Sequence, residues 1–215
     1  MKNILSILLV SVLIIGCSGN VSERGKRSVE RTYYENGQIE YERKYKDGKL
    51  DGLLTFYYED GQLNSEGNYI NGKCEGISKS YYENGHPKTE INNKDGEWNG
   101  FFKSYDENGK LKYKQNYKEG KVEGITLNYY ENGQLKSEGL YQDGKKNGLH
   151  KKYYESGQIE YEWNYKDGKR DGLSKFYKVN GQLDFVFYYK DGEQIEYTLN
   201  LNHILIPTIS YSTKK

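Results

Sequence analysis

The chain has 215 residues, with 32 basic and 31 acidic side chains. Because these charges are nearly balanced, there is no excess of positive charge to indicate nucleic-acid binding. Hydrophobic residues make up only 34% of the chain, yet it contains 24 tyrosines and 25 glycines. Disordered chains are poor in aromatic residues, so this composition argues against disorder and favours short strands joined by tight turns.

Residues 1–16 have the pattern of a signal peptide. Lys2 precedes an apolar run over residues 4–15, which is too short and wrongly flanked for a stable membrane-spanning helix. The run ends in I-I-G-C at residues 14–17, which resembles the bacterial lipobox. This resemblance implies cleavage before Cys17 and lipidation of that residue, and more than one acyl chain would give stable anchoring. The alternative is an ordinary signal peptide in which the cysteine has no role.

Residues 17–28 are polar and mildly basic after the cysteine, which is typical of a flexible tether. Ser18 follows the cysteine, and in Gram-negative lipoproteins, by resemblance, a residue other than Asp at this position implies sorting to the outer membrane. We therefore expect a lipid-anchored protein of the cell envelope, located at the outer membrane if the cell is Gram-negative.

Between residues 29 and 196 the sequence repeats with a period of 24 residues. Three series of glycines keep this step, and they begin at Gly37, Gly48 and Gly52. The first two series have seven members, and the third fails only where Glu196 takes the place of glycine. Because no insertion interrupts the seven copies, the sequence predicts a repeat array in which each unit packs against its neighbours.

Each unit reads as a β-hairpin. In the second copy the β-rich segment 53–59 precedes Asp60-Gly61, and the returning segment 62–69 precedes Asn71-Gly72. Asn and Asp tolerate a left-handed backbone and Gly adopts it without cost, so both dipeptides predict hairpin turns. We therefore expect an all-β fold, in which about seven 24-residue β-hairpin units form an elongated antiparallel meander sheet of about fourteen strands.

Period-2 alternation divides each strand between two faces. On the returning strand Tyr41 and Tyr45 alternate with Glu42 and Lys44. This predicts one dry face and one charged face. Two series of the outgoing strand are expected on the dry face with Tyr41, namely Leu53, Ile77, Phe101, Ile125, Leu149 and Leu173, and Tyr57, Tyr81, Tyr105, Tyr129, Tyr153 and Tyr177.

Tyrosine also recurs every 12 residues from position 33 to position 189, with Asn93 as the exception. We expect this series to form one buried ladder of rings across neighbouring strands. By the same assignment of faces, Tyr129 is buried beside Ile125, whereas Tyr130 shares the wet face with Thr126.

Two units depart from the pattern. In the third, Gly85-His86-Pro87 and Asn93 replace consensus residues, either as a recognition site or, as we favour, through drift. In the seventh, the segment 184–189 becomes apolar on both faces. An array needs protected ends, so residues 197–215 are expected to form a C-terminal cap and tail, with the cap itself over residues 197–211.

These repeats resemble the MORN repeat in its bacterial variant form, in which a strand, a turn of the E-N-G-Q kind and a Y-x-x-G-K-x-x-G segment follow one another. The resemblance covers about residues 29–195 and implies the hairpin array described above. Many bacterial proteins of this variant are similar to a family labelled as antitoxin components of toxin–antitoxin systems. Eukaryotic MORN proteins are implicated in membrane and protein contacts. The export signal sets this chain apart from a cytosolic antitoxin.

Few residues offer catalytic or metal-binding chemistry. His86, His150 and His203 stand at unrelated positions of the repeat, so they predict no metal site. Cys74, the one thiol besides Cys17, is either a reactive thiol or a tolerated turn residue, and we favour the second. We therefore predict a protein that is not an enzyme and needs no metal or cofactor. A charge ladder on the wet face accounts for the recurring carboxylates Glu42, Glu66, Glu90, Glu138 and Glu162.

The leading functional hypothesis is a non-enzymatic, membrane-anchored repeat scaffold of the bacterial cell envelope. It would bind a protein partner, for example a toxin that it neutralises in an antitoxin- or immunity-type role. The alternative is a surface lipoprotein that binds glycan or peptidoglycan. Under either hypothesis a second tyrosine series supplies the candidate contacts, because exposed rings can stack on sugars or anchor a protein interface: Tyr34, Tyr58, Tyr82, Tyr130 and Tyr154.

Overall fold

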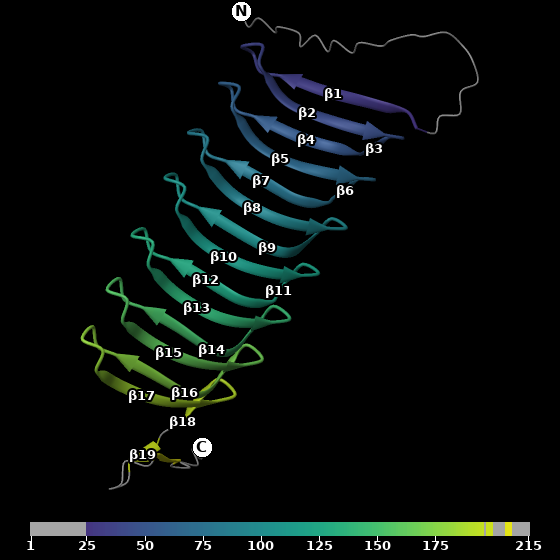
Figure 1. The fold of residues 1–215 in the computed structure, drawn as a ribbon. Helices are drawn as coiled ribbons and strands as arrows, with labels where there is room; N and C mark the ends of the chain where they lie inside the picture. Colours follow the sequence, from purple (N-terminus) through teal and green to yellow (C-terminus); the bar gives the residue numbers. More distant parts are fainter. Residues whose placement is uncertain (1–24, 196, 200–204, 208–215) are drawn as a thin grey trace, which may run out of the picture.

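A computed structural model describes residues 25–195, 197–199 and 205–207 of the chain. These residues form strands and turns, and most of the strands belong to one long antiparallel sheet of 18 strands (Figure 1). The expected all-β meander of hairpin repeats is confirmed. No helix among the described residues is long and apolar enough to cross a membrane.

The returning strands are uniform in length, while the outgoing strands are continuous in some copies and divided in others. The returning strands are β2 (Ile39–Lys46), β5 (Leu63–Ile70), β8 (Pro87–Lys94), β10 (Leu111–Lys118), β13 (Leu135–Gln142), β15 (Ile159–Lys166) and β17 (Leu183–Lys190). Continuous outgoing strands are β9 (Glu97–Tyr105), β14 (Lys145–Tyr153) and β16 (Lys169–Tyr177). Divided ones are β3 (Lys49–Leu50) with β4 (Gly52–Tyr57), β6 (Lys73–Cys74) with β7 (Gly76–Tyr81), and β11 (Lys121–Val122) with β12 (Gly124–Tyr129).

The division of three outgoing strands, together with the additional last strand of the sheet, explains why the sheet has 18 strands instead of the expected fourteen or so. Each divided strand restarts at a glycine with a left-handed backbone, with φ of 124° at Gly52, 77° at Gly76 and 81° at Gly124. Glycine adopts such a φ without strain, whereas a side chain would oppose it. The short strands β1 (Arg27–Tyr33) and β18 (Glu193–Ile195) complete the sheet at its two ends.

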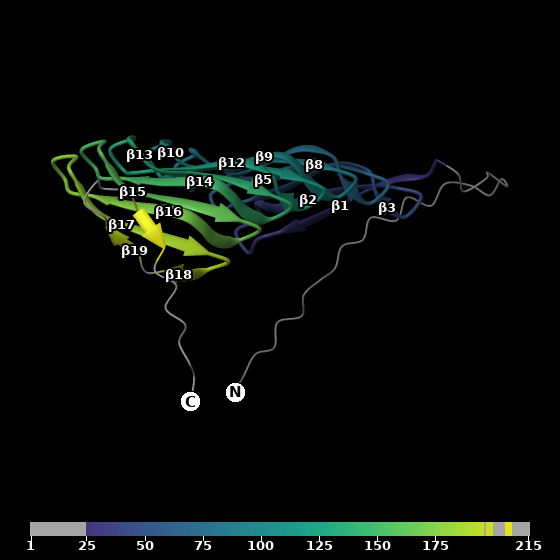
Figure 2. The same cartoon turned by 90° about the horizontal axis from the view of Figure 1, so that it is seen from below.

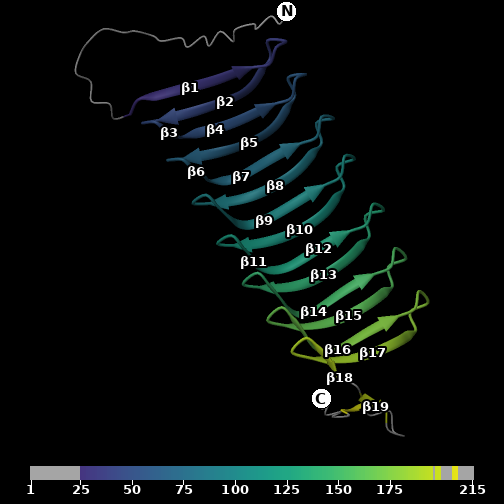
Figure 3. The same cartoon turned by 180° about the vertical axis from the view of Figure 1, so that it is seen from behind.

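The sheet is a single layer. With each divided strand counted as one, every strand pairs antiparallel with its neighbours along the chain, from β1 with β2 to β17 with β18. Seen from below and from behind, the described chain places no second layer of strands or helices on the sheet (Figures 2 and 3). Accordingly, no hydrophobic side chain in the described residues is fully buried.

The expected C-terminal cap lies largely outside the described residues. Two short strands of this region are described, β19 (Tyr197–Leu199) and β20 (Leu205–Pro207). They pair with each other in a separate two-stranded sheet. The expected signal peptide and most of the expected tether also lie outside the described residues.

The two kinds of turn differ in backbone geometry. At Asp47-Gly48 both residues have positive φ, 50° and 76°, as in a two-residue type I′ hairpin. At the other kind, Gly61 alone is left-handed, and its N–H donates to the Tyr58 carbonyl over 2.9 Å. The expectation of a left-handed Asp60 is therefore wrong. Its carboxylate instead accepts a hydrogen bond from the Gln62 N–H at 2.9 Å, which holds the turn from within.

The turn residues also join successive units along both edges of the sheet. On the type I′ edge, the Gly72 N–H donates to the Leu50 carbonyl at 2.7 Å, and the same bond recurs down the array. On the opposite edge, the Asn36 side-chain amide donates to the Glu59 carbonyl at 2.6 Å. Each unit is thus hydrogen-bonded to the next at both ends of its strands.

The strand register overturns the expected face of the outgoing strands. Tyr41 of β2 lies opposite Phe56 of β4, and Glu42 lies opposite Thr55. Residues directly opposite one another point to the same face of a sheet. Leu53, two positions from Thr55, therefore shares the face of Glu42 and not that of Tyr41. The reason is the two-residue turn, which pairs an odd-numbered residue of one strand with an even-numbered residue of the next.

The tyrosines spaced by 12 residues consequently do not form one ladder. Tyr57 belongs to the face of Glu42, whereas Tyr45, opposite Leu50, belongs to the face of Tyr41. Alternate members of the series lie on opposite faces. Residues 24 positions apart in the sequence form one column on one face, with one member in every second strand. The expected burial of Ile125 is also wrong, because its side chain is exposed while that of Thr126 is buried.

Candidate functional site

The register gives the sheet two faces of different chemistry. We call the first the aromatic face, and it carries Tyr41, Arg43 and Tyr45 from the returning strand with Leu54 and Phe56 from the outgoing strand, and their equivalents in later units. The second is the charged face, which carries Glu42, Lys44, Leu53, Thr55 and Tyr57 and their equivalents.

Rings on the aromatic face contact one another in groups. Trp98 stacks on Phe102 at 5.5 Å and meets the edge of Tyr117 at 5.0 Å. Further along, Phe176 lies 6.1 Å from Tyr161 and 5.8 Å from Phe187. Such ring pairs, within a strand or between neighbouring strands, each contribute roughly 0.5–1.5 kcal/mol beyond the area that they bury. They supply much of the apolar contact in a sheet that has no second layer.

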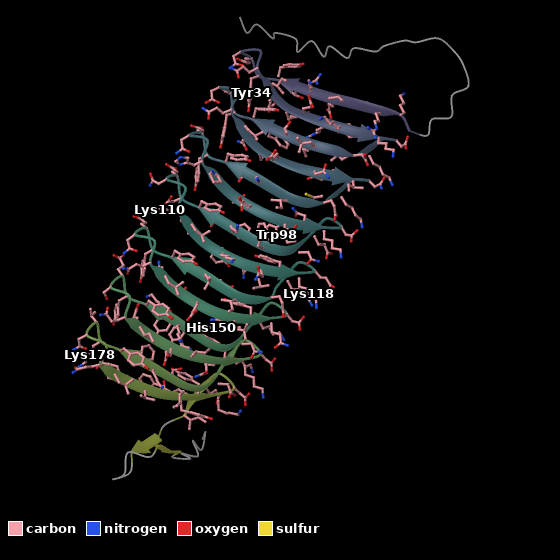
Figure 4. All side chains as sticks on the ribbon, in the orientation of Figure 1. Tyr34, Trp98, Lys110, Lys118, His150 and Lys178 are labelled. Atoms are coloured by element: carbon pink, nitrogen blue, oxygen red, sulfur yellow. The ribbon has the colours of Figure 1, made fainter. Side chains whose placement is uncertain are left out.

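Polar side chains are buried on the same face as these rings. Asn93, Gln115, Thr126, His150 and Ser174 are the buried polar residues of the aromatic face. Ser174 is fully covered, and its hydroxyl has no hydrogen-bond partner within the described chain. His150 lies between the rings of Tyr141 and Tyr165, and its Nε2 is 2.8 Å from the Leu140 carbonyl oxygen. Figure 4 shows Trp98 and His150 over the middle of the sheet, away from the turns.

Tyrosine, glutamate and lysine side chains interlock on the charged face. The Tyr81 hydroxyl donates to Glu66 at 2.9 Å, and the Tyr153 hydroxyl donates to Glu138 at 2.7 Å. Burial and these carboxylates raise the pKa of Tyr81 and of Tyr153 to about 12. Lysines from the next strand complete the ladder through the pairs Lys103–Glu90, Lys151–Glu138 and Lys175–Glu162.

An aliphatic stripe runs beside this ladder, nearer to the type I′ turns. Its members are exposed by 38% at Leu53, 48% at Ile77, 55% at Ile125 and 41% at Leu149. Leu140 lies opposite Asn147 one strand away and is also exposed. A repeated row of exposed aliphatic side chains, bordered by charges, has the anatomy of a protein interface. Sequence reasoning missed this stripe because it placed these residues on the dry face.

The tyrosines that the sequence singled out lie at the edge of the sheet formed by the E-N-G-Q turns, where Figure 4 labels Tyr34. All are half-buried, and their hydroxyls donate to main-chain carbonyls of the following unit. The rings of Tyr82 and Tyr130 are also covered by Lys88 and Lys136, whose Nζ atoms lie 5.4 and 5.3 Å from the ring centres. The hydroxyl bonds are Tyr34 to Tyr57 (2.6 Å), Tyr58 to Tyr81 (2.7 Å), Tyr82 to Tyr105 (2.9 Å), Tyr130 to Tyr153 (2.5 Å) and Tyr154 to Tyr177 (2.7 Å).

These bonds give the second tyrosine series a structural part as cross-links between units. A hydrogen bond of this kind contributes about 0.5–1.5 kcal/mol to stability. The rings keep some exposed surface, but the hydroxyls are engaged within the sheet. The Lys110 and Lys178 side chains lie along the same edge in Figure 4, and Lys118 lies at the opposite edge.

Cys74 lies in the short strand β6 and not in a turn, opposite Tyr69 on the aromatic face. It is a free, half-buried cysteine, and burial raises the pKa of its thiol. His86 contacts the Glu107 carbonyl oxygen through Nδ1 at 2.7 Å, far along the chain from His150. Among the described residues, no cluster of three potential ligands could hold a metal ion. Cys17 and His203 lie outside the described residues.

The geometry of the repeat agrees with the comparison against known families. The MORN repeat variant family matches six segments, residues 28–47, 50–71, 75–95, 98–119, 122–143 and 146–167. Together these segments make up more than half of the chain, so the chain belongs to the MORN repeat variant family. Beyond the last match, β16 and β17 continue the array with the same antiparallel pairing. A comparison with curated proteins found no match.

Proposed function

We propose that the chain is a non-enzymatic repeat scaffold of the bacterial cell envelope that binds a protein partner on its charged face. The observation that carries this proposal is the aliphatic stripe of Leu53, Ile77, Ile125 and Leu149, which is exposed along the length of the array. Exposed apolar residues that recur in register offer a partner a continuous strip of contact. Isolated exposed aliphatic residues would need no such explanation.

The neighbouring side chains supply the polar part of this interface. The Glu–Tyr–Lys ladder borders the stripe on one side, and its ion pairs hold the charges in fixed positions, as at Lys103–Glu90, 3.2 Å apart. Ordered charges at the rim of an interface select partners by complementarity more than they add affinity.

The cellular setting is part of the same proposal. A lipid on Cys17 and the segment up to residue 28 would tether the array to the membrane and leave both faces free for a partner. A toxin neutralised in an antitoxin- or immunity-type role is the partner class suggested by the bacterial variant repeats. Replacing Cys17 by Ser is expected to move the protein from the membrane fraction to the soluble fraction, and unchanged membrane partition would contradict lipid anchoring.

Site-specific photo-crosslinking in envelope extracts tests the binding face. Neighbouring residues point to opposite faces, so a crosslinker at Ile77 or Ile125 reports on the charged face and one at Ser78 or Thr126 reports on the aromatic face. We expect adducts with one protein from positions 77 and 125, and loss of those adducts when Leu149 is replaced by Ser. Adducts confined to positions 78 and 126, or none at any position, would contradict the proposal.

A further inference from the structure

The aromatic face carries a hollow where most of the rings of the second and third units are replaced by smaller side chains. In these units the column of Tyr41 holds Ser65 and Thr89, and the column of Phe56 holds Ser80. Asn93 replaces tyrosine in the third unit, which leaves Tyr69 as the one large ring that lines the hollow between β4 and β9. The result is a hollow of about 410 Å³, within the usual size range of small-molecule sites.

Aromatic and aliphatic side chains form the two walls of the hollow. On one side are Leu54 and Phe56 of β4, with Tyr41 packed 5.7 Å from the Phe56 ring. On the other side is Trp98 of β9, 39% exposed and held by its stack on Phe102. Four strand spacings separate β4 from β9, which amounts to roughly 19 Å. The walls are therefore far enough apart for a ligand of more than one ring.

The floor between the walls is largely polar and uncharged. It presents the hydroxyls of Ser65, Ser78, Ser80 and Thr89, and Asn93, together with the side chains of Tyr69, Cys74 and Ile91. The Ser80 and Thr89 hydroxyls are 2.6 Å apart and the Asn93 amide donates to Ser78 at 2.9 Å, so the floor is held in place before any ligand arrives. Hydroxyl groups that share one bond keep further acceptor capacity for a ligand.

Charged side chains are turned away from this hollow. Glu66 and Lys79 border it, but they lie opposite one another in the register of the charged face, so they reach the hollow through main-chain atoms. Cations of this region lie over rings outside the lining of the hollow, as Arg43 does over Tyr41 and Lys88 over Tyr82. The side chains that line the hollow from the aromatic face are thus uncharged.

We propose that this hollow binds a neutral oligosaccharide of two or three pyranose rings. A pyranose has apolar C–H faces that stack on aromatic rings and a rim of hydroxyls that exchange hydrogen bonds with Ser, Thr and Asn side chains. Trp98 and Phe56 provide the rings, and the serine and threonine floor provides the hydrogen-bonding groups. The site lies on the face opposite the one proposed to bind protein, so the two activities are independent. Binding of a sugar in this hollow would also give the unusual third unit a role in recognition.

Fluorescence of Trp98 can report on the site directly. The chain has two tryptophans, and Trp163→Phe leaves Trp98 as the only one. Phenylalanine already occupies the column of Trp163 at Phe187, so this background is expected to fold. Titration with cellotriose, maltotriose and tri-N-acetylchitotriose is expected to change Trp98 emission for at least one of them, with a dissociation constant of about 1 mM or below. Trigalacturonic acid, an anionic trisaccharide, serves as the comparison and is expected to bind about tenfold more weakly or worse.

Two variants locate the binding. Asn93→Tyr restores the residue of the other six copies and fills the hollow, so it is expected to weaken binding about tenfold or more while the fold is kept. Trp98→Ala, read by calorimetry in the otherwise unchanged protein, is expected to have the same effect without filling the hollow. Ile77→Ser, on the charged face of the same strand as Ser78, is the control and should leave the affinity unchanged.

Three outcomes would overturn the proposal. They are the absence of binding by all three neutral trisaccharides, binding that persists unchanged in Asn93→Tyr and Trp98→Ala, and tighter binding of the anionic sugar. None of these results bears on the protein-binding proposal, because crosslinking from positions 77 and 125 reads the opposite face. Conversely, failure of the crosslinking experiment leaves the sugar titration intact.

Discussion

Tyr129 and Tyr130 are neighbours in the sequence, but their hydroxyls have different surroundings. The Tyr130 hydroxyl donates to the Tyr153 carbonyl at 2.5 Å and so joins two units. The Tyr129 hydroxyl would meet a glutamate in other copies, but Lys114 stands at that position, and the hydroxyl has no partner within the described residues. We expect Tyr130→Phe to lower the free energy of unfolding by about 1 kcal/mol and Tyr129→Phe to change it little.

Chemical denaturation of the two variants measures this difference. Both remove one oxygen and keep the ring, so each is the matched control of the other. A larger loss from Tyr129→Phe would restore the face assignment expected from the sequence, in which Tyr129 is the buried member of the pair.

The titration of His150 is expected to make the stability of the array depend on pH. Burial lowers the pKa of His150 below its usual value, and the nearby Lys146 acts in the same direction. The folded chain therefore binds fewer protons than the unfolded chain when the pH falls below about 6.5. Stability is expected to be full above that pH and to decline as the pH falls toward the lowered pKa.

Thermal unfolding between about pH 7 and pH 5 tests this expectation against His150→Phe, whose new residue occurs in the same column at Phe102. The variant should lose most of the decline that this histidine causes. If the two proteins show the same slope over this range, the titration of His150 does not contribute to it.

At the scale of the strand, neighbouring columns are complementary in size. Gly139 of β13 lies opposite His150 of β14, and a Cβ built on Gly139 would come 2.0 Å from His150 Nδ1. Gly67 occupies the same column in β5, but a Cβ there would meet Ser78 at an ordinary 3.4 Å. Gly139 is therefore needed, because the His150 ring fills the space that a side chain would take. Gly67 is dispensable, because the space beside it has room for a Cβ.

We therefore expect opposite results from the same substitution at these two positions. Gly139→Ala should lower the free energy of unfolding by about 1–3 kcal/mol through overpacking. Gly67→Ala should be neutral or slightly stabilising, because alanine suits a strand interior better than glycine does. Denaturant unfolding of both variants measures the contrast, and equal losses would show that His150 does not occupy the space beside Gly139.

The strands themselves could be read from the sequence with little ambiguity. Glycine at a fixed 24-residue step, with Asn or Asp before it in most copies, marks both turns of the unit, and the structure places turns at Gly48 and Gly61 as expected. The charged alternation of Glu42 and Lys44 correctly separates the two sides of the returning strand. These features depend on local chemistry, which a single sequence records.

The face on which each side chain of the outgoing strand lies could not be predicted from the sequence in the same way. Ile125 and Thr126 alternate like any strand residues, and hydrophobicity alone favours burial of Ile125. The register decides otherwise, because the two-residue turn at Glu119-Gly120 links strands whose opposite positions differ in parity. The hollow could not be predicted either, since it depends on which residues of the strands from β4 to β9 share one face.

The array as a whole is one layer with two working faces, and that division is the basis of both functional proposals. The aromatic face buries polar residues on the same side as its rings, whereas the charged face exposes its aliphatic stripe. Because each unit contacts only its neighbours, the division repeats along the whole length of the sheet. The central claim is therefore that Ile125 points outward and Thr126 is covered.

Thiol labelling tests this claim most directly. In a Cys17→Ser, Cys74→Ser background, single Ile125→Cys and Thr126→Cys variants are treated with a maleimide under native conditions, and the modification rates are compared with those in denaturant. We expect the thiol at position 125 to react nearly as fast in the folded as in the unfolded chain, and the thiol at position 126 to be strongly protected by folding. Protection at position 125 together with free reaction at position 126 would contradict the assignment of the two faces.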